Sequence, residues 1–95
     1  MSKFYVYILL AENYNRNYVG KTNEPRRRLL EHNQGKNIST KAYKPWKIIY
    51  TETFSSENDA RERERYLKSG VGRELKKSII DHYRGVEQSG SSSGS

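Results

Sequence analysis

The start of the chain consists of an apolar run, a polar cluster and a second short run, and this pattern predicts a β-hairpin. Residues 3–10, KFYVYILL, are rich in aromatic and β-branched side chains, which favour strands. The polar cluster NYNRN follows as a turn, and a second short strand is expected at residues 18–21. Because successive side chains of a strand point to opposite faces of a sheet, Tyr7 is expected to lie beside Tyr18 on the paired strand.

Later segments carry the signals of three helices and one more strand. The first helix is expected to start at Asn23, a favourable N-cap, and to stop at Gly35. Pro45 then opens a third strand. Ser56 and Asp59 have the spacing of a capping box, which predicts the start of a second helix. The expected elements are therefore strands at residues 3–10, 18–21 and 45–54 and helices at residues 23–35, 56–69 and 73–84.

This order of elements predicts an α+β domain with a small, three-stranded, mainly antiparallel sheet flanked by helices. In the last helix, Leu75, Ile79 and Tyr83 form an apolar stripe that is expected to dock on the sheet. The domain is expected to span residues 1–86. Residues 87–95, EQSGSSSGS, contain no apolar side chain and are expected to form a flexible Ser/Gly-rich tail.

Composition narrows the class of function. The 95 residues suffice for one core, and 18 Lys and Arg against 11 Asp and Glu give a net charge of +7, which favours binding to polyanions such as nucleic acid. Cysteine is absent, which excludes disulfides and thiolate metal sites. The longest apolar run, residues 4–11, is too short to cross a bilayer, so a cytoplasmic protein with no membrane partner is expected. Metalloprotease, P-loop and GxSxG hydrolase motifs are missing.

Candidate chemistry lies on the first expected helix. Arg28 and His32 are four residues apart and therefore share one face of that helix. The arginine fork matches phosphate oxygens, and histidine can donate a hydrogen bond or accept a proton near neutral pH. Solvated surface charge is the more common outcome for such residues. Residues 36–44 are expected to form an exposed basic loop. The side chains expected to contact nucleic acid are Lys21, Arg26, Arg27, Arg28, Lys41 and Lys44.

The two tyrosines and one glutamate complete the candidate set. Tyr7 and Tyr18 are ordinary half-buried sheet residues unless nearby cations, with Lys21 and Arg28 the candidates, lower a phenol pKa. Glu64 shares a helix stripe with apolar residues at positions 60 and 67, so its carboxylate is expected to point toward the sheet. A charged group seldom points inward unpaired. Two explanations stay open: an ion pair with an arginine of the first helix, or a divalent cation such as Mg²⁺, which needs few protein carboxylates.

Together, these residues resemble the GIY-YIG endonuclease superfamily in its small, stand-alone bacterial form. YVYIL at residues 5–9 stands where the GIY half of the motif is expected, and YVG at residues 18–20 is the YIG half. Arg28 follows at the spacing of the family's catalytic arginine, and Glu64 stands at the glutamate of its A-x-x-x-E helix. The resemblance spans residues 4–83. A tyrosine replaces the glycine of the first half-motif.

The resemblance implies the GIY-YIG nuclease fold and metal-dependent hydrolysis of DNA that leaves a 5′-phosphate and a 3′-hydroxyl. It implies one divalent metal, Mg²⁺ or Mn²⁺, held by Glu64. Tyr7 or Tyr18 would activate the attacking water, with Tyr7 favoured, and Arg28 would stabilise charge on the phosphate. His32 would position groups or relay protons.

The expected partner is DNA, with branched or damaged DNA among the candidate substrates. The expected process is DNA repair or processing. Contacts mostly to phosphates would give low sequence specificity. One alternative is a catalytically weak or inactive nucleic-acid-binding module with the same fold, which needs the basic surface but not Glu64. A second is a basic interaction protein of the ribosome or of another repair enzyme, which would prefer RNA or protein.

Overall fold

Three strands and three helices follow one another in the expected order in the computed structural model, which describes residues 3–87. The α+β class and the three-stranded antiparallel sheet are confirmed. Residues 88–95, most of the expected tail, lie outside the described part of the chain. The elements are β1 (Phe4–Ala11), β2 (Arg16–Thr22), α1 (Pro25–Asn33), β3 (Lys47–Phe54), α2 (Glu57–Lys68) and α3 (Arg73–Glu87), with short 3-10 turns at Glu12–Tyr14 and Lys41–Tyr43.

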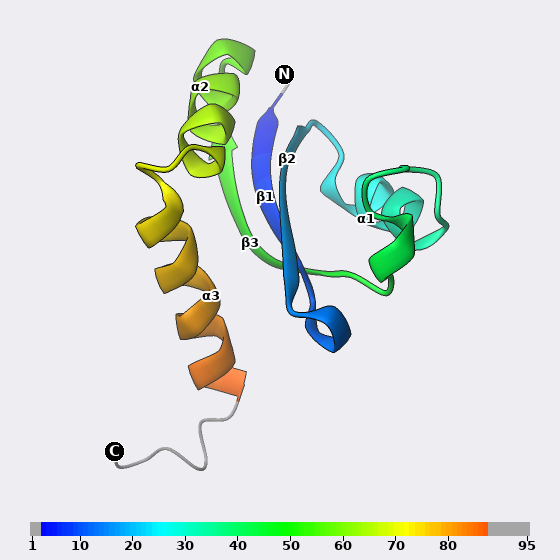
Figure 1. Cartoon of the computed structure of the whole chain (residues 1–95). Coiled ribbons are helices and arrows are strands. Elements are labelled where there is room, and N and C mark those ends of the chain that lie inside the picture. Colours follow the sequence, from blue (N-terminus) through cyan, green and yellow to red (C-terminus); the bar gives the residue numbers. More distant parts are fainter. Residues whose placement is uncertain (1–2, 88–95) are drawn as a thin grey trace.

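β1 is the central strand of the sheet, and β2 and β3 pair with it on either side in antiparallel orientation (Figure 1). Tyr7 lies opposite Gly20, and Tyr18 lies opposite Leu9. Residues directly opposite each other share a face, so Tyr7 and Tyr18 are diagonal neighbours on the same face. Their ring centroids are 6.4 Å apart, which confirms that the two tyrosines lie beside each other.

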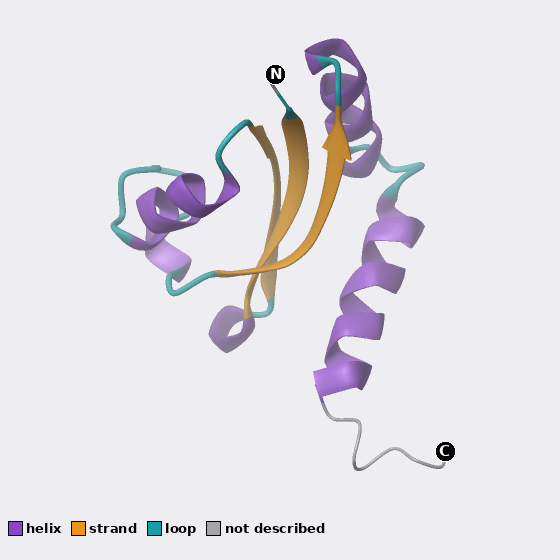
Figure 2. Ribbon diagram, turned by 180° about the vertical axis from the view of Figure 1, so that it is seen from behind, coloured by secondary structure: helices purple, strands orange, loops and turns teal. Residues whose placement is uncertain are grey.

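Helices cover both faces of the sheet (Figure 1, Figure 2). α1 lies on the face that carries Tyr7, where the buried side chains pack with Leu29 of α1. α2 and α3 lie on the opposite face and bury its alternate residues. The first core is Tyr7, Leu9, Ala11 and Trp46, and the second is Val6, Ile8, Val19, Ala60 and Leu67. None of the helices within residues 3–87 is long and apolar enough to cross a membrane.

The start of α1 differs from the expectation. Its N-cap is Glu24 instead of Asn23, and neither side chain caps the helix. Instead, the Thr22 hydroxyl accepts a hydrogen bond from the Glu24 N–H at 3.0 Å, which fixes the chain just before the helix. Gly35 follows the helix with a φ of 80°, a left-handed conformation that glycine adopts without strain, so the expected stop is confirmed. The expected cap of α2 is also confirmed, because the side chain of its N-cap serine accepts the N–H of Asp59.

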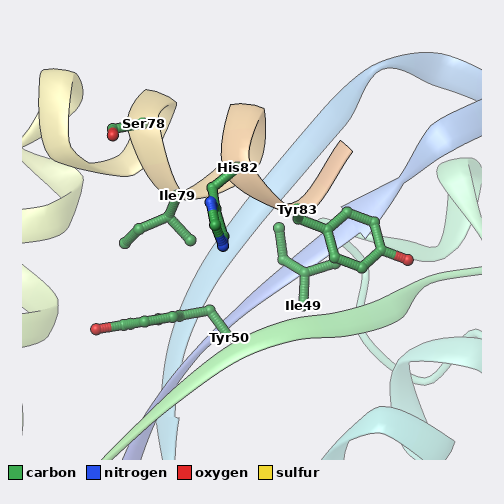
Figure 3. Close-up of a pocket in the computed structure, with 6 residues that line it drawn as sticks. All are labelled: Ile49, Tyr50, Ser78, Ile79, His82 and Tyr83. Atoms are coloured by element: carbon green, nitrogen blue, oxygen red, sulfur yellow. The ribbon is translucent and has the colours of Figure 1, made fainter. Parts of the chain in front are cut away.

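α3 packs on the sheet with one correction to its expected stripe. Leu75 and Ile79 contact the second core, as expected, and Ile80, which the expected stripe did not include, is the most buried side chain among residues 73–85. Tyr83 lies farther out, at a cavity of about 460 Å³ between α3 and β3 (Figure 3). The cavity is lined by Ile49, Tyr50, Ser78, Ile79, His82 and Tyr83, and His82 points toward Tyr50. These mostly apolar walls do not suit a phosphate ligand.

Candidate active site

The Tyr7 side chain is almost completely buried between β2 and α1. It crosses directly over Gly20 of the neighbouring strand: a Cβ atom at position 20 would lie 2.5 Å from Tyr7 Cζ and 2.9 Å from its Cε1. Ordinary carbon contacts are about 3.5–4.0 Å, so only glycine leaves room for the ring. Gly20 of the YVG segment therefore positions Tyr7 of the YVYIL segment.

A chain of hydrogen bonds begins at the Tyr7 hydroxyl. Its oxygen lies 3.1 Å from His32 Nε2, and His32 Nδ1 lies 2.8 Å from Thr40 Oγ1. The Thr40 hydroxyl in turn donates to the backbone carbonyl of Asn37 at 3.4 Å. Because a carbonyl can only accept, Thr40 accepts from His32 Nδ1–H, and this leaves Nε2 to accept from the Tyr7 O–H. The contacts thus select the His32 tautomer that can take a proton from Tyr7.

Burial sets the protonation of both groups. It raises the pKa of the Tyr7 phenol above the ordinary value of 10.0, although the nearby Arg28 guanidinium acts in the opposite direction. Burial also lowers the pKa of His32 below 6.5, and the positive charge of Arg28 lowers it further. The expectation that cations lower the tyrosine pKa is therefore wrong for Tyr7, because desolvation outweighs them. At neutral pH the phenol keeps its proton and the imidazole is neutral.

Arg28 lies at the entrance to this buried pair. Its guanidinium donates to Glu31 Oε1 at 2.8 Å, and its side chain is 34% exposed. A small hollow of about 60 Å³, lined by Arg28, Glu31, His32, Lys36 and Asn37, lies beside it and is large enough for an ordered water. The expected shared face of Arg28 and His32 is correct, but His32 is fully buried.

Tyr18 lies between the Tyr7–His32 pair and α2. Its ring centroid is 5.0 Å from that of His32, and the Lys68 ammonium lies 5.8 Å from the Tyr18 ring. Lys68 Nζ also lies 2.8 Å from Glu64 Oε2. Since α2 packs on the opposite face of the sheet and β2 is an edge strand, Lys68 reaches past the outer edge of β2. Glu64 is close enough for its charge to raise the pKa of Tyr7.

Glu64 differs from its expected environment. Its side chain is 20% exposed, and its ion-pair partner is Lys68 on its own helix, so the expected pair with an arginine of α1 is wrong. Within residues 3–87 no three His, Asp or Glu side chains are grouped to hold a metal. One carboxylate still fits a hard cation such as Mg²⁺, which keeps several waters and takes other ligands from substrate phosphates. Glu62 of the same helix is exposed.

The expected nucleic-acid contacts do not all lie on one side of the sheet. Lys21 lies opposite Val6, on the face away from Tyr7, and pairs with Glu57 of α2 at 3.1 Å. The hypothesis that Lys21 lowers the pKa of Tyr7 is therefore wrong. Arg26, Arg27, Lys41 and Lys44 are exposed on the side of α1 and the loop that follows it. Their contact with nucleic acid stays a prediction.

The loop after α1 contributes residues that the sequence did not single out. It was expected to be exposed, yet Thr40 is buried and its carbonyl accepts from Trp46 Nε1 at 2.9 Å. Asn33 pairs with both backbone groups of Trp46, accepting from its N–H at 2.6 Å and donating to its C=O at 3.0 Å. These contacts join α1, the loop and the start of β3, and so hold His32 in place. No periodic pattern marks Asn33 or Thr40.

Comparison with known proteins decides the family. A family model described as the GIY-YIG catalytic domain matches residues 3–78, which include both tyrosines, the arginine and the glutamate of the site. The chain belongs to the GIY-YIG family. This GIY-YIG chain therefore carries the catalytic domain of a nuclease family, as the motif spacing indicated.

Relatives of this GIY-YIG chain are small bacterial proteins. The UPF0213 protein of Limosilactobacillus reuteri is 39% identical over 83 residues, which are 84% of this chain and 85% of that protein. A UPF0213 protein of Staphylococcus haemolyticus is 37% identical and covers 85% of this chain and 98% of its own length. A solution NMR structure of a UPF0213 protein from Bacillus halodurans is 30% identical, with a TM-score of 0.49 over 81% of this chain and 84% of that chain.

Proposed function

We propose that the protein is a metal-dependent endonuclease that hydrolyses DNA phosphodiester bonds with low sequence specificity, in repair or processing. The observation that carries this proposal is the directed hydrogen-bond chain from Tyr7 to His32, with Arg28 beside it. A buried proton acceptor next to a phosphate-binding group is what hydrolysis of a phosphodiester needs. A purely structural histidine would not require the adjacent guanidinium.

In this proposal Tyr7 acts as a relay and not as a preformed base, since burial keeps its phenol protonated. The attacking water gives a proton to Tyr7 Oη while the Tyr7 proton moves to His32 Nε2, which lies 3.1 Å away. The water oxygen then forms its bond to phosphorus as the bond to the 3′-oxygen breaks. The leaving oxygen takes a proton from solvent, and His32 later returns its proton through the same path.

Arg28 and Glu64 act on the charge of the phosphate. Glu31 accepts from one N–H of the Arg28 guanidinium, and its other N–H groups bind phosphate oxygens in this proposal as negative charge develops there. Glu64 would hold Mg²⁺ or Mn²⁺, which when bound supplies positive charge at the scissile phosphate. For this, Lys68 must leave Glu64, and its ammonium then becomes available to a DNA phosphate.

The proposal is tested by cleavage of labelled double-stranded, branched and single-stranded DNA with Mg²⁺, Mn²⁺ or EDTA. Tyr7→Phe, Arg28→Ala and Glu64→Gln are compared with two matched controls. Arg61→Ala removes an exposed arginine of α2 that lies outside the expected nucleic-acid contacts, and Glu62→Gln removes an exposed carboxylate of the same helix. All variants are first checked for folding by circular dichroism.

Metal-dependent cutting that is lost in the three site variants and kept in the two controls is the expected result. Losses of about 100-fold or more are expected for a single electrostatic group of this kind. DNA binding without cutting, equal in wild type and all variants, would reject the nuclease. It would support the inactive nucleic-acid-binding module instead.

A further inference from the structure

A second, basic groove lies between α3 and the end of the β1–β2 hairpin, on the face of the sheet opposite Tyr7. Its volume is about 400 Å³. Four cationic side chains line it, Arg73, Lys76, Lys77 and Arg84, and one carboxylate, Asp81. None of these cations belongs to the set that the sequence assigned to nucleic acid. The positive charge of the groove therefore comes from residues that have no role in the proposed catalytic site.

Most of this positive charge is not neutralised within the protein. Among residues 3–87, no carboxylate forms an ion pair with Arg73, Lys76 or Lys77. Burial lowers the pKa of Lys76, and the charges of Arg73 and Lys68 lower it further, so like charges crowd this side chain. An anion that binds between these groups would relieve their mutual repulsion.

The groove and the active site meet the edge strand β2 at neighbouring residues. Asn17, which lines the groove, and Tyr18, which faces His32, are consecutive residues of the edge strand β2 and point to opposite faces. Lys68 connects the two sides, because it lies over the Tyr18 ring and its charge also acts on Lys76. A flexible anionic strand can therefore pass over the free edge of β2 from one site to the other.

The far end of the groove is fixed by a contact between α3 and the hairpin turn. Arg84 donates to the Asn15 side chain at 2.8 Å, and Asn15 has a left-handed φ of 52°. Arg73 and Arg84 are separated by about 16 Å along the helix. That length corresponds to about five nucleotides of a stacked single strand at about 3.4 Å each.

We propose that this α3 groove binds the phosphodiester backbone of the nucleic-acid strand on one side of the bond that is cut. The proposal rests on the proposed function for its orientation toward Tyr18, but the binding itself does not require turnover. Lysine and arginine side chains with two asparagine amides contact phosphates without reading bases. The groove therefore adds affinity and holds the strand in one direction across the site.

The test measures binding of fluorescein-labelled single-stranded DNA by anisotropy in EDTA, over a range of salt concentrations. The Lys76→Gln/Lys77→Gln variant is compared with Lys3→Gln/Arg65→Gln, which removes the same charge from exposed residues outside the groove. Arg73→Gln/Arg84→Gln provides a second groove variant if the first does not fold. RNA of the same sequence and poly-L-glutamate serve as further ligands.

Both groove variants are expected to bind more weakly, and the slope of log K against log salt is expected to fall by about 0.7 for each lost phosphate contact. A similar loss with RNA supports a backbone contact. The proposal is overturned if groove and control variants share one slope, or if poly-L-glutamate at equal charge competes as well as DNA. A slope change in the groove variants of a protein that never cuts DNA would reject the nuclease and keep the groove.

Discussion

Gly20→Ala is the sharpest single test of how the site is built. The change adds one methyl group, and the added Cβ would lie 2.5 Å from Tyr7 Cζ. Restoring an ordinary contact of about 3.5 Å requires a shift of about 1 Å. Tyr7 cannot move freely, because it is almost fully buried and its hydroxyl is hydrogen-bonded to His32. We therefore expect the ring to leave its position over β2 and the bond to His32 to lengthen or break.

The expected cost follows from overpacking of a core. Inserting a methyl group into a well-packed site typically costs about 1–3 kcal/mol. For a domain of this size, 1 kcal/mol lowers Tm by about 4–8 °C. If Tyr7 relays protons, DNA cleavage should also fall by about 100-fold, within the range attributed to general acid–base catalysis.

Urea unfolding and thermal melting of Gly20→Ala give the stability, and the cleavage assay gives the activity. Gly85→Ala in α3 is the matched control, because a Cβ atom there meets no other atom within 4 Å. Alanine is a better helix former than glycine, so this control should be unchanged or more stable by up to about 1 kcal/mol. A Gly20→Ala protein as stable and as active as wild type would refute the tight packing of Tyr7 on β2.

Three further predictions concern charge. First, the neutral form of His32 accepts the proton, and burial lowers the pKa of His32 below 6.5. In a pH–rate profile, cleavage should therefore stay constant down to pH 6.5 and fall only at lower pH, where the imidazole becomes protonated. An unchanged rate at that lower pH would contradict the relay. Second, the hydrogen bonds from Arg63 lower the pKa of Glu52, so its contribution to the free energy of unfolding is complete above pH 4.5 and is lost as the pH falls below that value. Glu52→Gln should therefore cost about 1 kcal/mol in urea unfolding at neutral pH, with a smaller difference at lower pH. Third, the Lys68 ammonium competes with Mn²⁺ for the Glu64 carboxylate, and an ion pair at a partly exposed site is worth about 0.5–1 kcal/mol. Lys68→Met should therefore tighten Mn²⁺ binding by about two- to five-fold, measured by calorimetry without DNA.

The sequence predicts the elements well wherever the signal is local. The apolar run of β1, the serine cap of α2 and the glycine after α1 each depend on residues that are neighbours in the chain, and each is confirmed. The shared face of Arg28 and His32 follows from helix geometry alone. The start of α1 was misplaced by one residue because the hydroxyl of Thr22, and not an asparagine cap, fixes the chain there.

The environment of the site residues could not be predicted in the same way. His32 is buried because Thr40, in a segment with no periodicity, closes over it and accepts its Nδ1–H. The partner of Glu64 is a lysine of the same helix, which competes with any arginine farther away and forms the pair locally. Burial of Tyr7, which raises the pKa of its phenol, depends on packing between β2 and α1. The contacts of His32 and Tyr7 arise from tertiary structure and leave no pattern in the sequence, whereas the Glu64–Lys68 pair has the i, i+4 spacing of a local helix pair.

In the proposed mechanism, residues from both faces of the sheet act on one substrate, and the edge position of β2 makes this possible. In a central strand, the two faces are separated by paired neighbours on both sides. β2 has a neighbour on one side only, so its alternate residues meet at a free edge. Val19 points into the core with α2, whereas Tyr18 and Gly20 shape the catalytic side. One strand thus fixes Tyr7 and contributes Val19 to the core, and in the proposed mechanism it gives α2 a path to bring the Glu64 carboxylate to the phosphate.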